Sequence, residues 1–216
     1  MENSEFRERE PLSSLILYYL FKSPILVPMY HIYFRGRVYG LENVPKKHPL
    51  VVVCNHASYF DPPFLSSCLG RPVAFMAKEE LFSVPILKEG IRLYGAYPVK
   101  RGASDRSAIR SALAAVKDGW LVGIFMQGTR TADGVIDDPK LGAAMIAAKA
   151  QVPLLPVSLW GTEKILKKGS PIPRSVPLTM RVGEIIQPPE SNKRQALEDV
   201  TQKCTTVINQ LHALGR

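Results

Sequence analysis

A histidine and a carboxylate follow a strongly apolar run in the segment VVVCNHASYFDP, residues 51–62. His56 and Asp61 lie five positions apart, and Pro62 disfavours helical geometry at the residue before it. We therefore expect a turn that brings the Asp61 carboxylate back to one imidazole nitrogen, with Asn55 orienting the loop through side-chain hydrogen bonds. A carboxylate there fixes the tautomer and leaves the other nitrogen as a general base. The alternative is that Asp61 caps a helix and His56 is an ordinary loop histidine.

Two further segments combine glycine with cationic side chains at predicted strand ends. In GAYPVKRG, residues 95–102, Lys100 and Arg101 stand between glycines, and the planar guanidinium of Arg101 suits a phosphate. In FMQGTR, residues 125–130, a glycine lets the backbone approach a ligand, and the threonine and arginine after it can bind an anion. Each segment is also compatible with an ordinary solvated loop.

A fourth segment, VPLLPVS at residues 152–158, places two prolines around an apolar strand. Proline cannot donate a backbone hydrogen bond, so the segment also fits a purely structural edge strand.

Taken in order, the four segments resemble the sequence blocks of the glycerolipid acyltransferase family. The first matches the family pattern N-H-x-x-x-x-D and the second G-x-x-x-x-x-R, although Tyr97 stands where the family usually has Phe. The third is usually F-P-E-G-T-R, so Met126 and Gln127 depart from the pattern. The fourth is the proline-bracketed strand. The resemblance runs from about residue 40 to about residue 186.

The resemblance implies a fatty acyl transfer from a thioester to the free hydroxyl of 1-acyl-glycerol-3-phosphate, making phosphatidic acid for phospholipid biosynthesis. His56 would be the general base, Asp61 would hold and polarise it, and backbone amides near the third segment are candidates for an oxyanion site. The implied partners are lysophosphatidic acid and either acyl-CoA or acyl-carrier protein as co-substrate, with no cofactor. The implied substrate-binding residues are Asn55, Lys100, Arg101, Gln127, Gly128, Thr129 and Arg130.

Gln127 is the departure that bears on chemistry. Glutamine keeps the shape and one acceptor of the usual glutamate, but it has no charge and gains two N–H donors. If the position only hydrogen-bonds the acceptor, glutamine is adequate; if the charge is required, activity or acceptor choice is altered. We favour the first interpretation because His56 and Asp61 are both present.

Other functions remain open at this point. The same chemistry on glycerol 3-phosphate or another lysophospholipid is one alternative, and a non-catalytic lipid-binding relative is another. A thioesterase with Cys54 as nucleophile is a third, which we disfavour because a cysteine inside a β run is more often a buried apolar residue.

Composition narrows the partners. The chain has 216 residues with 28 Lys and Arg against 19 Asp and Glu, a net charge of +9 that favours an anionic partner. Because the basic residues are not interleaved with aromatics, we expect no nucleic acid. The basic group Lys164, Lys167, Lys168 and Arg174 could instead face anionic lipid or an acidic carrier protein. Three widely spaced cysteines indicate reduced thiols, and His31, His48 and His212 have no partners at metal-ligand spacing, so no metal is expected.

Residues 12–34 form the most apolar long segment. Pro24 and Pro28 should break any helix, so we expect two short helices meeting near residue 23, forming a hairpin in the membrane surface. The alternative is a pair of amphipathic helices packed on the protein's own core. The acidic start argues against a signal peptide. We therefore predict a membrane-associated segment at 1–34, an acyltransferase domain at 35–216, and a peripheral or monotopic protein on the cytoplasmic face of the membrane.

The rest of the chain alternates strands with helices, which predicts an α/β fold with a mostly parallel sheet flanked by helices. The expected strands are an edge strand at 35–45, then 50–54, 73–77, 93–99, 120–126, 152–159 and 178–186. The expected helices are 61–69, 104–117, 140–150 and 194–214.

Overall fold

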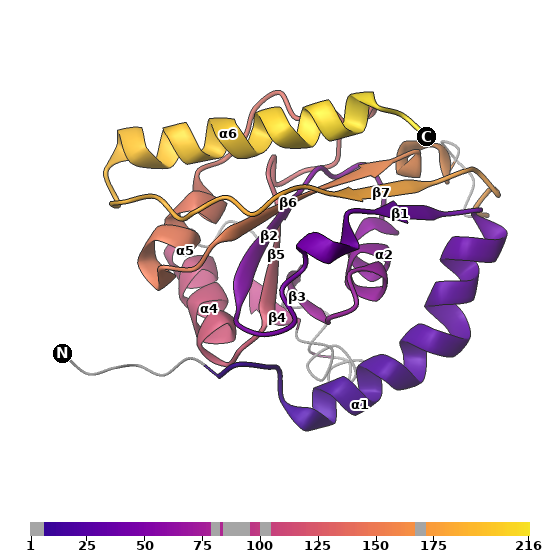
Figure 1. The fold of residues 1–216 in the computed structure, drawn as a ribbon, viewed down its shortest axis with the longest axis horizontal. Helices are drawn as coiled ribbons and strands as arrows, with labels where there is room; N and C mark the ends of the chain where they lie inside the picture. Colours follow the sequence, from indigo (N-terminus) through magenta and orange to yellow (C-terminus); the bar gives the residue numbers. More distant parts are fainter. Residues whose placement is uncertain (1–6, 79–82, 84–95, 100–104, 167–171) are drawn as a thin grey trace.

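The computed structural model describes residues 7–78, 83, 96–99, 105–166 and 172–216. These residues form a seven-stranded sheet flanked by helices, as predicted (Figure 1). The strands are β1 Arg37–Tyr39, β2 Leu50–Cys54, β3 Val73–Lys78, β4 Tyr97–Val99, β5 Leu121–Phe125, β6 Leu154–Trp160 and β7 Thr179–Val182. The helices are α1 Leu12–Phe21, α2 Asp61–Cys68, α4 Asp105–Lys117, α5 Gly142–Ala150 and α6 Arg194–Ala213. Short 3-10 turns cover Leu41–Asn43 and Thr162–Lys164.

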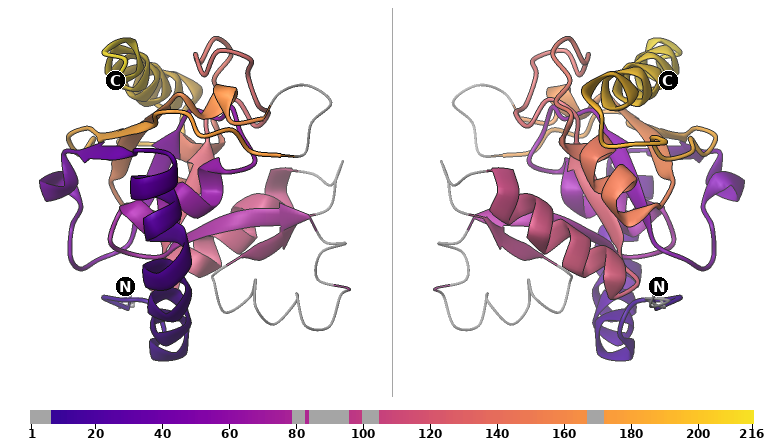
Figure 2. Two further views of the ribbon diagram at one scale, coloured as in Figure 1. Left: turned by 90° about the vertical axis from the view of Figure 1, so that its right-hand side faces the viewer. Right: turned by 90° about the vertical axis from the view of Figure 1, so that its left-hand side faces the viewer.

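The sheet order is β1-β7-β6-β2-β5-β3-β4, and its neighbouring strands are parallel except for the antiparallel β6–β7 pair. Strand β2 lies at the centre and is apolar at every position, so it is covered on both faces. Val51 and Val53 join the core beneath α4, α5 and α6. Leu50, Val52 and Cys54 join the core beneath α2 and the N-terminal segment. Figure 2 shows these helical layers on the two sides of the sheet.

The N-terminal segment differs from the predicted hairpin. Residues Leu12–Tyr33 form one helical run of 22 residues, in which Lys22–Leu26 and Met29–Tyr33 are π-helical. Proline removes a backbone donor, and wider π turns accommodate such a gap without ending the helix. The two prolines therefore modify the helix where we expected them to divide it. Tyr30 and Phe34 are buried in the core beneath α2, which ties the end of the run to the domain.

The structure excludes the alternative that the fourth segment is an edge strand, because β6 lies in the interior of the sheet between β7 and β2. Pro156 is tolerated there because it lies beyond the last β6–β7 pair, Val157 with Val182. Its carbonyl still accepts a hydrogen bond from Gly183 N at 2.8 Å. The expected edge strand at 35–45 does occupy an edge, but the strand itself covers only Arg37–Tyr39.

A buried ion pair lies at the amino ends of the strands. Arg71 Nη2 and Nε lie 2.7 and 3.0 Å from Glu10 Oε1, and both residues are buried. The same guanidinium donates to the carbonyls of Pro45, His48 and Gly119, which precede β2 and β5. The stretch before α1 is therefore fixed at the end of the sheet opposite to the carboxyl ends.

Candidate active site

The polar residues of the first and third segments meet because β2 and β5 end together. The two strands are parallel neighbours with Cys54 opposite Phe125, and Met126 N donates to Cys54 O at 3.0 Å. The loops that follow the two strands therefore leave the same edge of the sheet, where sites in α/β proteins form.

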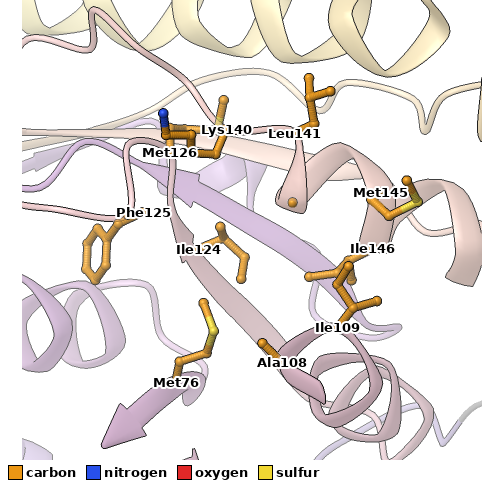
Figure 3. Close-up of a pocket in the computed structure, with 12 residues that line it drawn as sticks. Met76, Ala108, Ile109, Ile124, Phe125, Met126, Lys140, Leu141, Met145 and Ile146 are labelled. Atoms are coloured by element: carbon orange, nitrogen blue, oxygen red, sulfur yellow. The ribbon is translucent and has the colours of Figure 1, made fainter. Parts of the chain in front are cut away.

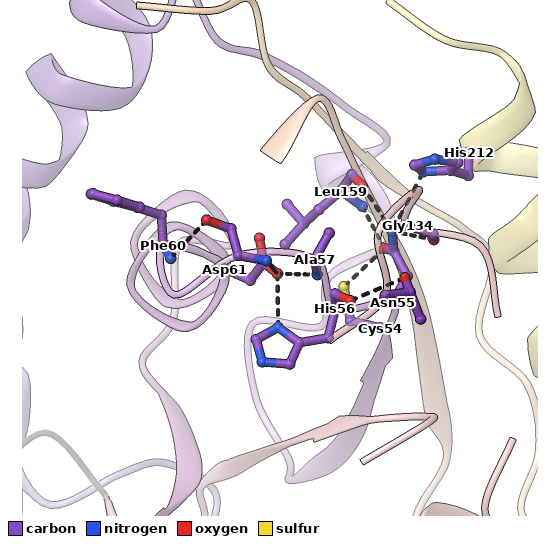
Figure 4. A network of polar contacts seen from close by, with 11 residues as sticks. Cys54, Asn55, His56, Ala57, Phe60, Asp61, Gly134, Leu159 and His212 are labelled. Atoms are coloured by element: carbon purple, nitrogen blue, oxygen red, sulfur yellow. Dashed lines mark hydrogen bonds and ion pairs between the residues drawn. The ribbon is translucent and has the colours of Figure 1, made fainter. Parts of the chain in front are cut away.

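His56 and Asp61 form the predicted contact. His56 Nδ1 lies 2.8 Å from Asp61 Oδ2, and the same oxygen accepts from the amides of Ala57 and Ser58 at 2.7 Å each (Figure 4). Because an ionised carboxylate only accepts, Nδ1 carries the ring proton and Nε2 keeps its lone pair. The Asp61 side chain is fully buried, whereas 17% of the His56 side chain is exposed. The pair can thus present a base to a ligand while its carboxylate stays shielded.

Asp61 does not cap α2 as one interpretation required. It is the first residue of the helix, the N-cap position belongs to Phe60, and α2 has no side-chain cap within the described residues. Pro62 fits in the first turn because its missing N–H has no helical partner there. The carboxylate instead faces back along the chain, toward the imidazole and the two amides before the helix.

Aromatic rings fix the plane of the imidazole. The rings of His56 and Phe125 are stacked, and Phe125 is in turn stacked on Phe75 with centroids 5.4 Å apart. Gly123 makes room for this row, since a Cβ at that position would lie 2.3 Å from the Phe75 ring. Sequence reasoning missed these residues, because their approach depends on the register of β3 against β5.

Asn55 has a positioning role. Its side chain is buried, Nδ2 donates to the carbonyls of Gly134 and Leu159 at 2.8 and 2.9 Å, and Oδ1 accepts from Leu159 N at 2.8 Å (Figure 4). Both amide hydrogens and one oxygen lone pair are therefore used by backbone groups. This arrangement favours orientation of the loop over the substrate contact that the family resemblance implied.

The third segment places its cationic residue beside the His56 loop. Gly128 is exposed and has a φ of 69°, a left-handed conformation with which the chain turns after β5. The Arg130 guanidinium lies over the Tyr59 ring at 3.6 Å from the centroid and donates to the Tyr59 hydroxyl at 2.9 Å. Thr129 is exposed next to it, and the half-buried Gln127 directly follows Met126 at the strand end. Thr131 N donates to His56 O at 2.8 Å, which joins this loop to the base.

The second segment is described only in part. Lys100 and Arg101 lie outside the described residues, so their predicted phosphate contact stays a prediction. Tyr97 is described and buried, and burial raises the pKa of its hydroxyl.

Two pockets meet at the strand ends. A pocket of about 410 Å³ is lined by His56, Tyr59, Thr129 and Arg130, together with the rings of Phe75 and Phe125. A pocket of about 590 Å³ adjoins it, and the two share Met76, Phe125 and Gly128. The larger pocket is lined mostly by apolar side chains from β5, α4 and α5 (Figure 3). The labelled side chains include Ile109, Ile124, Met145 and Ile146. The base therefore stands where an apolar pocket meets a cationic one.

Cys54 is not placed as a nucleophile. It is fully buried in the core beneath α2, and burial raises the pKa of its thiol well above the ordinary value. Among the described residues there is no cluster of three or more His, Cys, Asp or Glu side chains that could hold a metal ion. That the reaction needs neither metal nor cofactor stays a prediction.

Comparison with known proteins identifies what this arrangement resembles. The acyltransferase family model matches residues 35–160. The chain is 37% identical over 141 residues to a chloroplastic 1-acyl-sn-glycerol-3-phosphate acyltransferase of Brassica napus, covering 64% of this chain and 41% of that protein. It is 34% identical over 137 residues to the 1-acyl-sn-glycerol-3-phosphate acyltransferase of Bacillus subtilis, covering 62% of this chain and 68% of that protein.

A solved structure resembles nearly the whole chain. The 1-acyl-sn-glycerophosphate acyltransferase PlsC of Thermotoga maritima superposes with a TM-score of 0.69 at 28% identity, covering 92% of this chain and 86% of that one. The matched region spans about two fifths of the length of the plant relatives.

Proposed function

Since the chain belongs to the acyltransferase family, we propose that it transfers a fatty acyl group from a thioester to the free hydroxyl of 1-acyl-glycerol-3-phosphate, forming phosphatidic acid. The observation that carries this proposal is the contact of His56 Nδ1 with buried Asp61, which leaves Nε2 available at a pocket lined by Arg130. The names of the relatives from Brassica napus and Bacillus subtilis support the choice of acceptor.

The chemistry follows from a poor nucleophile and a positioned base. His56 Nε2 takes the hydroxyl proton as the hydroxyl oxygen attacks the thioester carbonyl, and a tetrahedral oxyanion forms. The C–S bond then breaks, the imidazolium returns the proton to the departing sulfur, and the products are an ester and a free thiol. A base placed in this way contributes about 10²–10⁴-fold in rate. Asp61 stabilises the imidazolium without leaving its two amide donors.

The two pockets separate the substrates by polarity. The phosphate of the acceptor binds beside Arg130 and Thr129, where a planar guanidinium donates hydrogen bonds to the phosphate and so orients the hydroxyl. The acyl chain of the donor lies in the apolar pocket between β5, α4 and α5, whose lining side chains are apolar apart from Lys140. Predicted contacts from Lys100, Arg101 and Gln127 add to the phosphate side.

The test is acyl transfer from labelled acyl-CoA and acyl-carrier protein to lysophosphatidic acid. We expect transfer by the native protein, its loss in His56→Ala and a fall of about 10²–10⁴-fold in Asp61→Asn. The matched control is His31→Ala, at an exposed histidine in the N-terminal run. Absence of transfer by the native protein from either donor contradicts the proposal. Transfer to glycerol 3-phosphate or another lysophospholipid instead would assign the same chemistry to that acceptor.

We also propose that the run Leu12–Tyr33 associates with a membrane at the cytoplasmic face, as a peripheral or monotopic anchor. By length and composition the helix is apolar enough to cross a membrane, and only a small part of it is buried in the protein. Ile16 and Leu20 are each 63% exposed, one turn apart on one helical face. Basic Lys164 and Arg174 are exposed, although Lys164 also pairs with Glu163, whereas Lys167 and Lys168 lie outside the described residues. Cys54, Cys68 and Cys204 are buried and form no disulfide, as expected in a reducing compartment.

Flotation with phosphatidylglycerol vesicles tests this anchor. We expect the native protein to float with the vesicles and Ile16→Glu/Leu20→Glu to remain at the bottom, since two carboxylates oppose insertion of the apolar face. Leu214→Glu is the control, because it adds the same charge at an exposed leucine on the C-terminal end. Equal flotation of all three proteins contradicts the proposed anchor.

A further inference from the structure

The long loop between β5 and α5, residues 126–141, carries the third segment and has no helix or strand of its own. The two ends of the loop are joined by a hydrogen bond, because Lys140 N donates to Met126 O at 2.7 Å. A loop of this length loses much conformational entropy when it is ordered, so its geometry must be held by contacts from elsewhere. Within the loop, Arg130 faces the cationic pocket and Thr131 donates to His56 O.

The C-terminal helix α6 supplies two of these contacts. The Asn209 side chain forms two hydrogen bonds with the backbone of Ile136. Ile136 N donates to Asn209 Oδ1 at 3.0 Å, and Asn209 Nδ2 donates to Ile136 O at 2.9 Å. One turn further along, His212 Nε2 lies 3.0 Å from Asp133 O. Both side chains therefore hold the same stretch of loop.

His212 also reaches the end of β6 and Asn55. Because Nε2 donates to the Asp133 carbonyl, Nδ1 is an acceptor, and it lies 3.4 Å from both Ser158 Oγ and Asn55 Nδ2. The imidazole is buried, and Gly134 passes so close that a Cβ there would lie 2.7 Å from its Cε1. Asn55, which directly precedes His56 in the chain, donates to Gly134 O. Figure 4 shows His212, Gly134 and Asn55 converging beside the His56 loop.

We propose that Asn209 and His212 are positioning residues for the transfer reaction, which rests on the function proposed above. They fix the β5–α5 loop so that Thr131 holds the His56 backbone and Arg130 stands at the pocket. Neither residue touches the pockets, so neither is a catalytic residue. We call the hydrogen bonds of Asn209 and His212 to the loop the α6 clamp. Because a small displacement of an oriented base or phosphate ligand strongly lowers the rate, loss of the clamp lowers turnover and weakens acceptor binding.

The experiment compares Asn209→Ala, His212→Leu and His212→Gln in the full chain. Glutamine places an amide N–H near the position of Nε2, so it can still donate to Asp133 O, whereas leucine cannot. We expect kcat to fall about tenfold or more in Asn209→Ala and His212→Leu, with a raised KM for the acceptor. We expect His212→Gln to recover most of the lost kcat.

Two controls on the same helix separate positioning from loss of stability. Gln210→Ala removes an exposed amide next to Asn209, and Ile208→Val trims a fully buried core side chain while leaving the hydrogen bonds of Asn209 and His212 in place. Full kcat in Asn209→Ala and His212→Leu, or an equal fall in Ile208→Val, overturns the proposal. So does a failure of His212→Gln to recover kcat.

Hydrogen exchange gives a second readout that needs no activity. We expect the amides of Thr131 and Ile136 to exchange at least about tenfold faster in Asn209→Ala and His212→Leu, while those of β2 keep the native rate. Unchanged exchange rates of the Thr131 and Ile136 amides in both variants overturn the proposal that Asn209 and His212 hold the loop. If the native protein transfers no acyl group, the proposed function fails and exchange alone decides whether α6 holds the loop.

Discussion

The imidazole of His56 lies flat against the ring of Phe125, with the two ring centroids 3.9 Å apart and the planes inclined by 16°. Asp61 fixes one edge of the imidazole and Phe125 fixes its plane, so the free nitrogen has one direction in which to accept a proton. One contact comes from within the first sequence segment, and the other comes from the strand that leads into the third.

Phe125→Leu tests the second of these constraints. Leucine keeps an apolar side chain at the strand end but has no flat ring, so the imidazole can rotate about its Asp61 contact. We expect kcat to fall about tenfold with little change in the KM of the acceptor, because Arg130 is not displaced. Steady-state kinetics of acyl transfer measure this. A loss confined to the KM of the acceptor would show that Phe125 shapes the pocket and does not orient the base.

Gln127→Glu restores the residue that the family usually has at this position. The side chain is half-buried at the end of β5, near the loop that carries Arg130. An added negative charge opposes a bound phosphate, and we expect the KM for lysophosphatidic acid to rise about fivefold, with a smaller change in turnover. Kinetics with varied acceptor check this. A hundredfold rise in turnover would mean that the native chain lacks a charge needed for catalysis.

Cys54→Ala separates acyl transfer by a base from a thioesterase with a cysteine nucleophile. The thiol is fully buried, and its pKa is raised by that burial, so the thiolate needed for attack is disfavoured. We expect the variant to keep transfer within about threefold of the native rate, the difference reflecting a small cavity in the core. Abolished transfer in a variant that still unfolds cooperatively would favour the nucleophile.

Cys204 gives a pH dependence of stability. Cys204 faces the core from α6, and burial raises the pKa of its thiol from the ordinary value of 9.0 to about 12. The unfolded chain therefore releases this proton first, so the contribution is complete below about pH 9 and is lost as pH rises toward 12. We expect the stability difference between the native protein and Cys204→Ala to narrow from pH 9 to 11, by at most about 1.4 kcal/mol per pH unit.

Urea unfolding at several pH values measures that difference. The comparison with Cys204→Ala is needed because lysines and tyrosines titrate over the same range in both proteins. A gap that stays constant between pH 9 and pH 11 would contradict the buried thiol as its source.

The buried pair of Glu10 and Arg71 should matter for stability and not for chemistry. Arg71→Met removes the guanidinium bound to the buried Glu10 carboxylate and leaves only Arg9 Nε at 3.8 Å, and we expect a loss of about 3–5 kcal/mol in the free energy of unfolding. Glu10→Leu/Arg71→Met should lose less than the sum of the two single variants, by about 1 kcal/mol or more. Urea unfolding of the four proteins completes the cycle, and strict additivity would contradict a coupled pair. The folded fraction should keep its turnover, because the pair lies at the amino ends of the strands.

Sequence alone determined the features that depend on local order along the chain. The alternation of strands and helices predicted the mostly parallel sheet, and the continuous apolar run at β2 predicted a strand covered on both faces. The five-residue spacing of His56 and Asp61 predicted their contact, because a turn and a proline restrict so short a segment. The four segments also identified the family before any contact was known.

Tertiary structure decided what depends on which distant segments become neighbours. Strand β6 looked like an edge strand because of its prolines, and only the sheet order placed it in the interior. The apolar N-terminal segment became one helical run because a π turn accommodates Pro24 and the helix continues through Pro28, which lies just before the second π turn. Phe125 met His56 through strand register, and α6 reached the β5–α5 loop across more than seventy positions. Such contacts arise from packing, which no local spacing encodes.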